Sequence, residues 1–162
     1  MHHTISVLVV NQSGVLSRIS GLFSGRGFNI ESLNVAETTD SGISRMTIVT
    51  RGDDKKIEQV TKQLNKLVDV IKVIDLTEEH FVDRELILIK MNAEARVRGE
   101  ILRIVDIFRA KVIDVNPDTY TVEITGDEGK TKGFLDLLKP LGIKEVVRSG
   151  RIAISRGIKP MN

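Results

Sequence analysis

Four residues near the start of the chain, Asn11 to Gly14, form a short polar loop whose chemistry suits a bound carboxylate. A β-branched apolar run ends at Val10, and apolar residues recur at helical spacing from Leu16, so the loop joins a strand to a helix. Ser13 is placed to cap that helix, and Gly14 lets the backbone approach a ligand closely. The first N–H groups of a helix lack internal partners and favour an anion. Read only locally, the same residues form an ordinary turn and cap.

A second string, residues 126–131 (GDEGKT), follows a predicted strand and ends like a phosphate-binding loop. Its spacing differs from that motif, because Gly126 and Gly129 enclose two residues where a Walker A loop has four. So short a backbone cannot wrap a triphosphate. We therefore expect plain helix initiation there, with Asp127 and Glu128 complementing the helix dipole.

The three histidines, His2, His3 and His80, lack the spacing of metal ligands, since none has a second ligand three or four positions away. No Ser/His/Asp set is readable. The chain contains no cysteine, which excludes disulfides, thiolate metal sites and cysteine nucleophiles. We expect solvated histidines and no metal site, no cofactor and no catalytic site in this chain.

Composition points to a globular protein with aliphatic cores. Hydrophobic residues make up 41% of the 162 residues, while aromatic residues make up only 4%. Twenty-four basic and 22 acidic residues leave a net charge of +2, too near balance to indicate a polyanionic partner. No charged leader precedes an apolar stretch, and no apolar run approaches the roughly 18 residues that span a membrane. These features predict a soluble, cytoplasmic protein.

The elements that must position the loop follow the order strand, helix, strand, strand, helix, strand. Strands are expected at residues 5–10, 28–37, 44–51 and 70–76. The first helix ends at Gly25 and Gly27, and the second follows Gly52 and Asp53. This order is the ferredoxin-like arrangement.

The same order repeats after an acidic stretch without clear period, residues 78–83, which we interpret as a linker. Strands are expected at residues 85–91, 111–115 and 119–125, helices around Val97–Phe108 and Phe134–Leu141, and a final strand or hairpin at residues 143–155. The sequence thus predicts an α+β protein with two tandem βαββαβ domains, residues 1–77 and 84–162. Domains this small hide their sheet edges, and side-by-side dimerisation does so.

Residues 11–30 (NQSGVLSRISGLFSGRGFNI), with IESLNVAETTD and SRMTIVT beyond them, resemble the ACT domain of the small, regulatory subunits of acetolactate synthase. The resemblance continues in register across residues 84–157, including the closing strings at 148–150 (RSG) and 155–157 (SRG). It implies that the first domain is an ACT domain and that two copies pair to hold a branched-chain amino acid, valine above all, between them.

The family's effector contacts fall on six residues of this sequence: Asn11, Gly14, Val15 and Leu16 of one chain, with Asn29 and Ile30 of the other. The chemistry agrees, because valine needs an anion site, partners for its ammonium group and an apolar wall. The helix start, the two asparagine amides and the three aliphatic side chains supply these in turn. Residues 92–96 offer no counterpart of the loop, so we expect no second effector site.

The resemblance further implies a non-catalytic regulatory subunit in the biosynthesis of valine, leucine and isoleucine. Its partner is a large catalytic subunit that carries thiamine diphosphate, magnesium and FAD. The implied role is to activate that subunit and to confer feedback inhibition by valine.

Two other functions remain open at this point. One is a stand-alone tandem sensor of amino acids that acts on another enzyme or on a transcription regulator. The other is RNA binding, because RNA-recognition motifs have the same order of elements. RNA binding is disfavoured, since the strands that would carry the stacking aromatic residues contain Tyr120 as their only ring. A basic tail could meet an acidic partner or form a solvated edge: Arg148, Arg151, Arg156 and Lys159.

Overall fold

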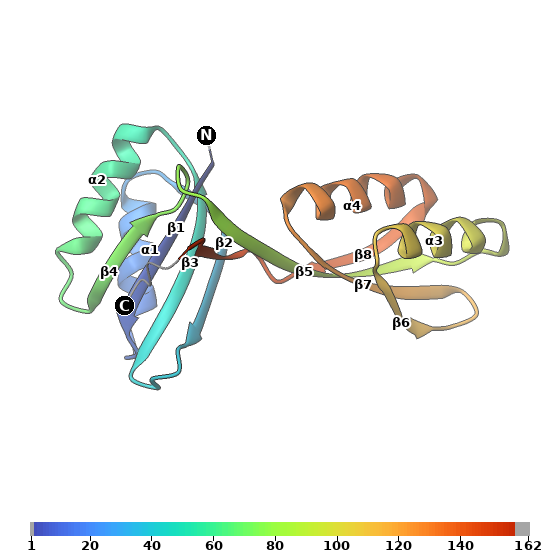
Figure 1. Cartoon of the computed structure of the whole chain (residues 1–162), viewed down its shortest axis with the longest axis horizontal. Helices are drawn as coiled ribbons and strands as arrows, with labels where there is room; N and C mark the ends of the chain where they lie inside the picture. Colours follow the sequence, from blue (N-terminus) through green and yellow to red (C-terminus); the bar gives the residue numbers. More distant parts are fainter. Residues whose placement is uncertain (1, 158–162) are drawn as a thin grey trace. The chain divides into compact units, whose positions relative to one another are not determined.

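The computed structural model describes residues 2–157, which form two compact units. The first unit contains the chain up to Val82 together with the segment that begins at Arg151, and the second contains Asp83–Gly150. Each unit holds one antiparallel sheet with two helices on one face (Figure 1). The predicted α+β class with two ferredoxin-like units is confirmed.

The first unit has the strand order β2-β3-β1-β4. Its elements are β1 (His2–Val10), α1 (Val15–Gly25), β2 (Asn29–Glu37), β3 (Ile43–Arg51), α2 (Asp54–Asn65) and β4 (Val70–Asp75). The core lies between the sheet and the helices, where Ile5 and Ile48 meet Ile19 and Phe23. Within residues 2–157, strand β2 has β3 as its one neighbour, so it forms an edge of the sheet.

Capping groups fix where both helices of this unit begin or end. Helix α1 stops because Gly27 adopts φ +74°, while the N–H groups of Gly27 and Phe28 bond back to the carbonyls of Ser24 and Phe23. Asp53 caps α2 by accepting a hydrogen bond from the Lys55 N–H at 2.8 Å. These stop and start signals agree with the sequence.

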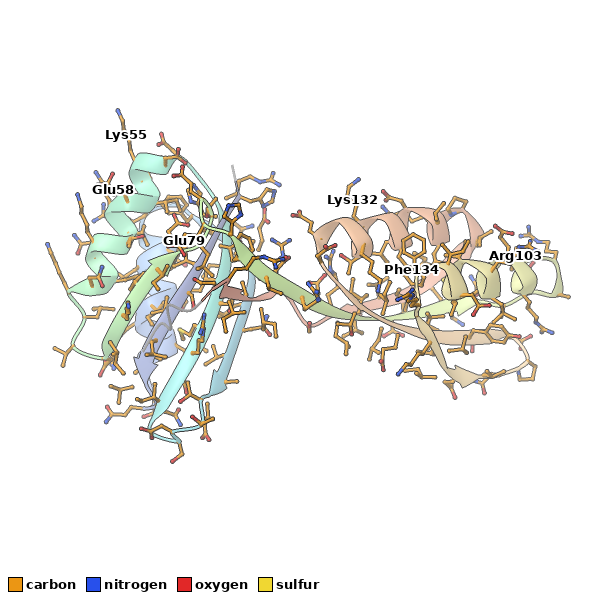
Figure 2. All side chains as sticks on the ribbon, in the orientation of Figure 1. Lys55, Glu58, Glu79, Arg103, Lys132 and Phe134 are labelled. Atoms are coloured by element: carbon orange, nitrogen blue, oxygen red, sulfur yellow. The ribbon has the colours of Figure 1, made fainter. Side chains whose placement is uncertain are left out.

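The second unit repeats the topology, with strand order β6-β7-β5-β8. Its elements are β5 (Phe81–Asn92), α3 (Ala95–Ile107), β6 (Lys111–Val115), β7 (Thr119–Gly126), α4 (Glu128–Gly142) and β8 (Ile143–Arg148). Phe134 of α4, labelled in Figure 2, is fully buried in the core and packs edge-on against Phe108. No helix within residues 2–157 is both long and apolar enough to cross a bilayer.

The chain is divided differently from the prediction at two places. The expected linker, residues 78–83, is not a separate connector, because β5 already begins at Phe81. The expected final element at 143–155 is two strands, β8 and β9 (Ile152–Ser155), and both pair with β5. Strand β9 therefore belongs to the first unit, although it was predicted within a domain 84–162. Its hydrogen bonds to the first sheet explain this grouping.

Candidate functional site

Asn11 fastens the predicted binding loop to the far end of β2. Its N–H donates to the Gly42 carbonyl at 2.8 Å, and its side-chain Nδ2 donates to the Ser41 carbonyl at 2.9 Å. The same Nδ2 donates to Glu37 Oε1 at 3.1 Å. Asn11 and the last residue of β2 are thus direct neighbours at one end of the sheet.

The start of α1 differs from the prediction in one respect. Gly14, with φ +86°, is the residue before the helix, and no side chain caps it, so the expected capping role of Ser13 is wrong. The left-handed glycine turns the backbone. The Val15 N–H then donates to the backbone carbonyl of Gln12 at 3.5 Å and not to a capping side chain. The N–H groups of Leu16 and Ser17 have no acceptor one turn earlier in the helix. The start of α1 therefore has the expected donors.

Arg18 is a neighbour of the loop that the sequence reading missed. A Cβ added to Gly14 would lie 3.2 Å from Arg18 Nη1, so the guanidinium covers the position where a side chain would project. Arg18 forms an ion pair with Asp69, whose carbonyl accepts the Val10 N–H at 2.8 Å. The pair braces the loop against the residues before β4. Side chains of a helix lean toward its N-terminus, so the position of Arg18 in the first turn of α1 could have predicted that it lies beside the loop.

The three predicted apolar residues differ in burial. Val15 is 3% exposed and belongs to the core, Leu16 is 43% exposed, and Ile30 packs against the core from β2. Leu16 is the one that presents a free aliphatic surface beside the loop.

Asn29 and Ile30 open β2 next to an irregularity in the sheet. Asn29 pairs with Arg51 and Ile30 with Thr50, whereas the next paired residue is Ser32, so Glu31 bulges. The Glu31 carboxylate lies 2.9 Å from His2 Nδ1 and 3.3 Å from Arg51 Nε. The alternation of the strand gave no sign of this bulge or of the charged cluster around it.

Within one chain the two groups of predicted site residues lie at opposite ends of the sheet. Strands β1 and β2 both run antiparallel to β3, so they are parallel to each other. Glu37, beside Asn11, pairs with Ser44, and Asn29 pairs with Arg51, seven residues along β3. At a rise of roughly 3.3 Å per residue, that separation is about 23 Å. One copy alone does not bring the six residues together.

Comparisons with known proteins decide the family. Residues 5–72 match the family model described as the AHAS small subunit-like ACT domain, and residues 84–157 match the model described as the small subunit of acetolactate synthase. The chain belongs to the acetolactate synthase small-subunit family. The predicted family and the ACT domain in the first unit are confirmed.

Relatives and a solved structure of the small-subunit family cover nearly the whole chain. The chain is 54% identical to a probable acetolactate synthase small subunit of Archaeoglobus fulgidus, over 98% of this chain and 99% of the relative. It is 56% identical to the small subunit of Aquifex aeolicus, over 95% of this chain and 81% of the relative. A crystal structure of the Thermotoga maritima small subunit matches with a TM-score of 0.87 and 41% identity, covering 98% and 99% of the two chains.

His3 is not solvated, which corrects the sequence reading. It is 5% exposed, with Nδ1 3.0 Å from Asp75 Oδ2 and Nε2 2.9 Å from Asp54 Oδ1. The histidine thus ties β1 to β4 and α2. Residues distant in sequence supply both carboxylates, so spacing gave no sign of them.

The phosphate-loop-like string in this small-subunit family member starts a helix, as predicted. Asp127 Oδ1 accepts the Lys130 N–H at 2.9 Å, and Lys130 Nζ donates back to the Thr125 carbonyl at 3.1 Å. The lysine is therefore bound to the backbone of its own loop.

The loop before α3 is built differently from the loop before α1. Helix α3 begins after Glu94, which has an extended backbone with φ −61°. Arg98 Nε donates to the Ala93 carbonyl at 2.6 Å. The left-handed glycine that precedes α1 therefore has no equivalent here, in agreement with the absence of a loop motif at residues 92–96.

Proposed function

We propose that this chain is the non-catalytic regulatory subunit of an acetolactate synthase and that it binds valine between two copies of its ACT domain. The observation that carries the proposal is the separation of the site residues along the sheet. If two β2 edges pair antiparallel in the register centred on Leu33, Asn29 of the partner subunit comes opposite Glu37, the residue that Asn11 contacts. The dimer would then have two such sites, each made of the loop of one copy and the strand start of the other.

Each part of the proposed seam has a chemical counterpart in an α-amino acid. The open N–H groups at the start of α1 face a carboxylate, and helix ends of this polarity stabilise anions. The side-chain oxygens of Asn11 and Asn29 accept from the ammonium group. Leu16, exposed beside the loop, and Ile30 contact the branched side chain.

The proposed partner is a large catalytic subunit that carries thiamine diphosphate, magnesium and FAD. This chain would stabilise the active state of that subunit, and valine would lower its activity. Such inhibition requires that valine bind the two states of the complex with different affinities, since equal affinity shifts no equilibrium.

The direct test is reconstitution. The purified chain is added to a large subunit loaded with its cofactors, and acetolactate output is measured with and without valine. We expect higher output on addition of the chain and a decrease with valine. Unchanged output in both conditions would contradict the proposal and favour a stand-alone amino-acid sensor.

The choice of effector among branched-chain amino acids is tested separately. Thermal stability of the isolated chain is measured with each of the twenty amino acids, because a ligand that binds only the folded state raises the melting temperature. We expect the largest increase with valine, and responses to leucine and isoleucine that rank below it.

A further inference from the structure

Strand β9 lies on the face of the first sheet opposite its helices and is fastened there by two side chains. Asn34 of β2 donates through Nδ2 to the Arg151 carbonyl at 3.2 Å. Arg45 of β3 donates through Nη2 to the Ala153 carbonyl at 3.2 Å. Alternate carbonyls of an extended strand point to the same side, so one edge of this segment faces the sheet.

The contact is partly buried, although its groups are polar. Ser6 and Thr47, paired across β1 and β3, are 0% and 4% exposed, and Ala153 above the sheet is 7% exposed. Arg45 also donates through Nε to Ser6 Oγ at 3.0 Å. Burial lowers the pKa of Arg45, and a guanidinium nevertheless stays charged in proteins. Loss of the bond to the Ala153 carbonyl would leave a partly buried cation with one partner fewer.

Hydrogen bonds join residues 149–156 to β5 and to the two residues before it. On the side of the first unit, the Arg156 N–H donates to the His80 carbonyl at 2.8 Å, and Ser155 Oγ donates to Glu79 Oε2, labelled in Figure 2, at 3.1 Å. On the other side, the Ser149 N–H donates to the Leu86 carbonyl at 3.0 Å. Residues 149–151, between β8 and β9, lie outside both strands.

We infer that β9 is a strap whose attachment to the first sheet is coupled to the ACT effector seam, an inference that rests on the proposed function. Asn34 lies on β2, the same strand that begins with Asn29 and Ile30, so a shift of β2 on effector binding acts directly on the strap. Valine binding favours the fastened strap, and the fastened strap in turn favours valine binding, because coupling between two sites is reciprocal.

The test uses the full chain, valine as the probe, and Arg45→Met. Hydrogen exchange of the β9 amides and the Kd for valine by calorimetry are measured in both proteins. In the unmodified chain, valine slows β9 exchange. In Arg45→Met, β9 exchanges about tenfold faster, the factor expected for one hydrogen bond from a charged group. Valine no longer slows this exchange, and its Kd rises by about fivefold or more.

Arg26→Met is the matched control, because Arg26 makes an exposed bond to Gln59 Oε1 at 3.1 Å from the end of α1. It should leave β9 exchange and valine affinity unchanged. If Arg45→Met does not fold, Asn34→Ala removes the other fastening bond with a smaller loss of packing and is expected to act in the same direction.

The possible outcomes distinguish a failure of the strap inference from a failure of the proposed function. Valine that binds the unmodified chain while leaving β9 exchange unchanged overturns the strap alone. So does a variant whose β9 stays fully protected, since the two side chains then do not hold the strand. Absence of any valine binding to the unmodified chain overturns the proposed function and, with it, the strap.

Discussion

At the scale of single residues, Gly14 decides what can approach the start of α1. Its φ of +86° and the Arg18 guanidinium, 3.2 Å from an added Cβ, leave no room for a side chain without adjustment. Gly14→Asp would bring a carboxylate next to this guanidinium, where it competes with Asp69 and repels a carboxylate ligand. We expect a holoenzyme that is still activated but no longer inhibited by valine, as measured by acetolactate output against valine concentration.

The control for this variant is Gly25→Asp at the other end of α1, where an added Cβ meets no atom within 4 Å. It adds the same charge to the same helix and should leave the inhibition curve in place. Normal valine sensitivity in Gly14→Asp would refute the site.

Gly52 makes room for the ring of Phe28. An added Cβ would lie 1.9 Å from Phe28 Cε1, and the ring is 8% exposed in the core of the first unit. We expect Gly52→Ala to lower the free energy of unfolding by about 1–3 kcal/mol, the usual cost of overpacking. Denaturant unfolding measures this, with Gly99→Ala on the exposed face of α3 as a variant that should lose nothing. Equal stability of the two variants would show that Phe28 moves aside freely.

Residue types and local spacing were enough to find the loop, the glycines and the start of α2 after Asp53, because these act on their own neighbours in the chain. They did not reveal the Arg18–Asp69 pair, the Glu31 cluster or the carboxylates around His3. Each of these depends on residues that only the folded sheet brings together.

At the scale of elements, the two helices of the ACT unit start by different means, and this difference can be measured. Asp53 caps α2, whereas Ser13 makes no capping bond to α1. Asp53→Ala should therefore lower the free energy of unfolding by about 1 kcal/mol, the typical worth of an N-cap. Ser13→Ala should leave it unchanged in the same denaturant titration. A comparable loss in both variants would restore a capping role to Ser13.

Periodicity predicted the helices and most strands, because each buries one apolar face, although β1 begins three residues and β5 four residues before the expected start. Periodicity gave the wrong assignment for residues 78–83 and 151–155, because the structure of these segments depends on pairing with distant residues. Strand β5 runs through the expected linker, and β9 is held by Asn34 and Arg45, more than one hundred residues away in sequence. The residues of β9 themselves give no sign that the strand packs on the first sheet and not on the second.

At the scale of the whole molecule, an effector site shared between two chains requires that the copies meet along the β2 edge. Val35 on β2 and Ile71 on β4 are 44% and 49% exposed and lie on opposite edge strands of one sheet. Val35→Asp would place a charge in an apolar seam and should weaken the dimer by about tenfold or more, because burying an unpaired charge is costly. Ile71→Asp should not change dimerisation. Sedimentation over a concentration series distinguishes them, and equal weakening, or none, would place the contact elsewhere.

The most direct measurement mixes two variants that each lose one half of the site. Asn11→Ala and Asn29→Ala chains are each purified alone. The two chains are also co-expressed with different tags so that the mixed dimer can be isolated, and valine binding to all three proteins is measured by calorimetry. If each site is shared between two chains, neither variant binds valine alone, and the mixed dimer regains one intact site and binds a single valine. If the mixed dimer binds no better than its parents, the two asparagines do not meet across a seam, and the shared-site account is contradicted.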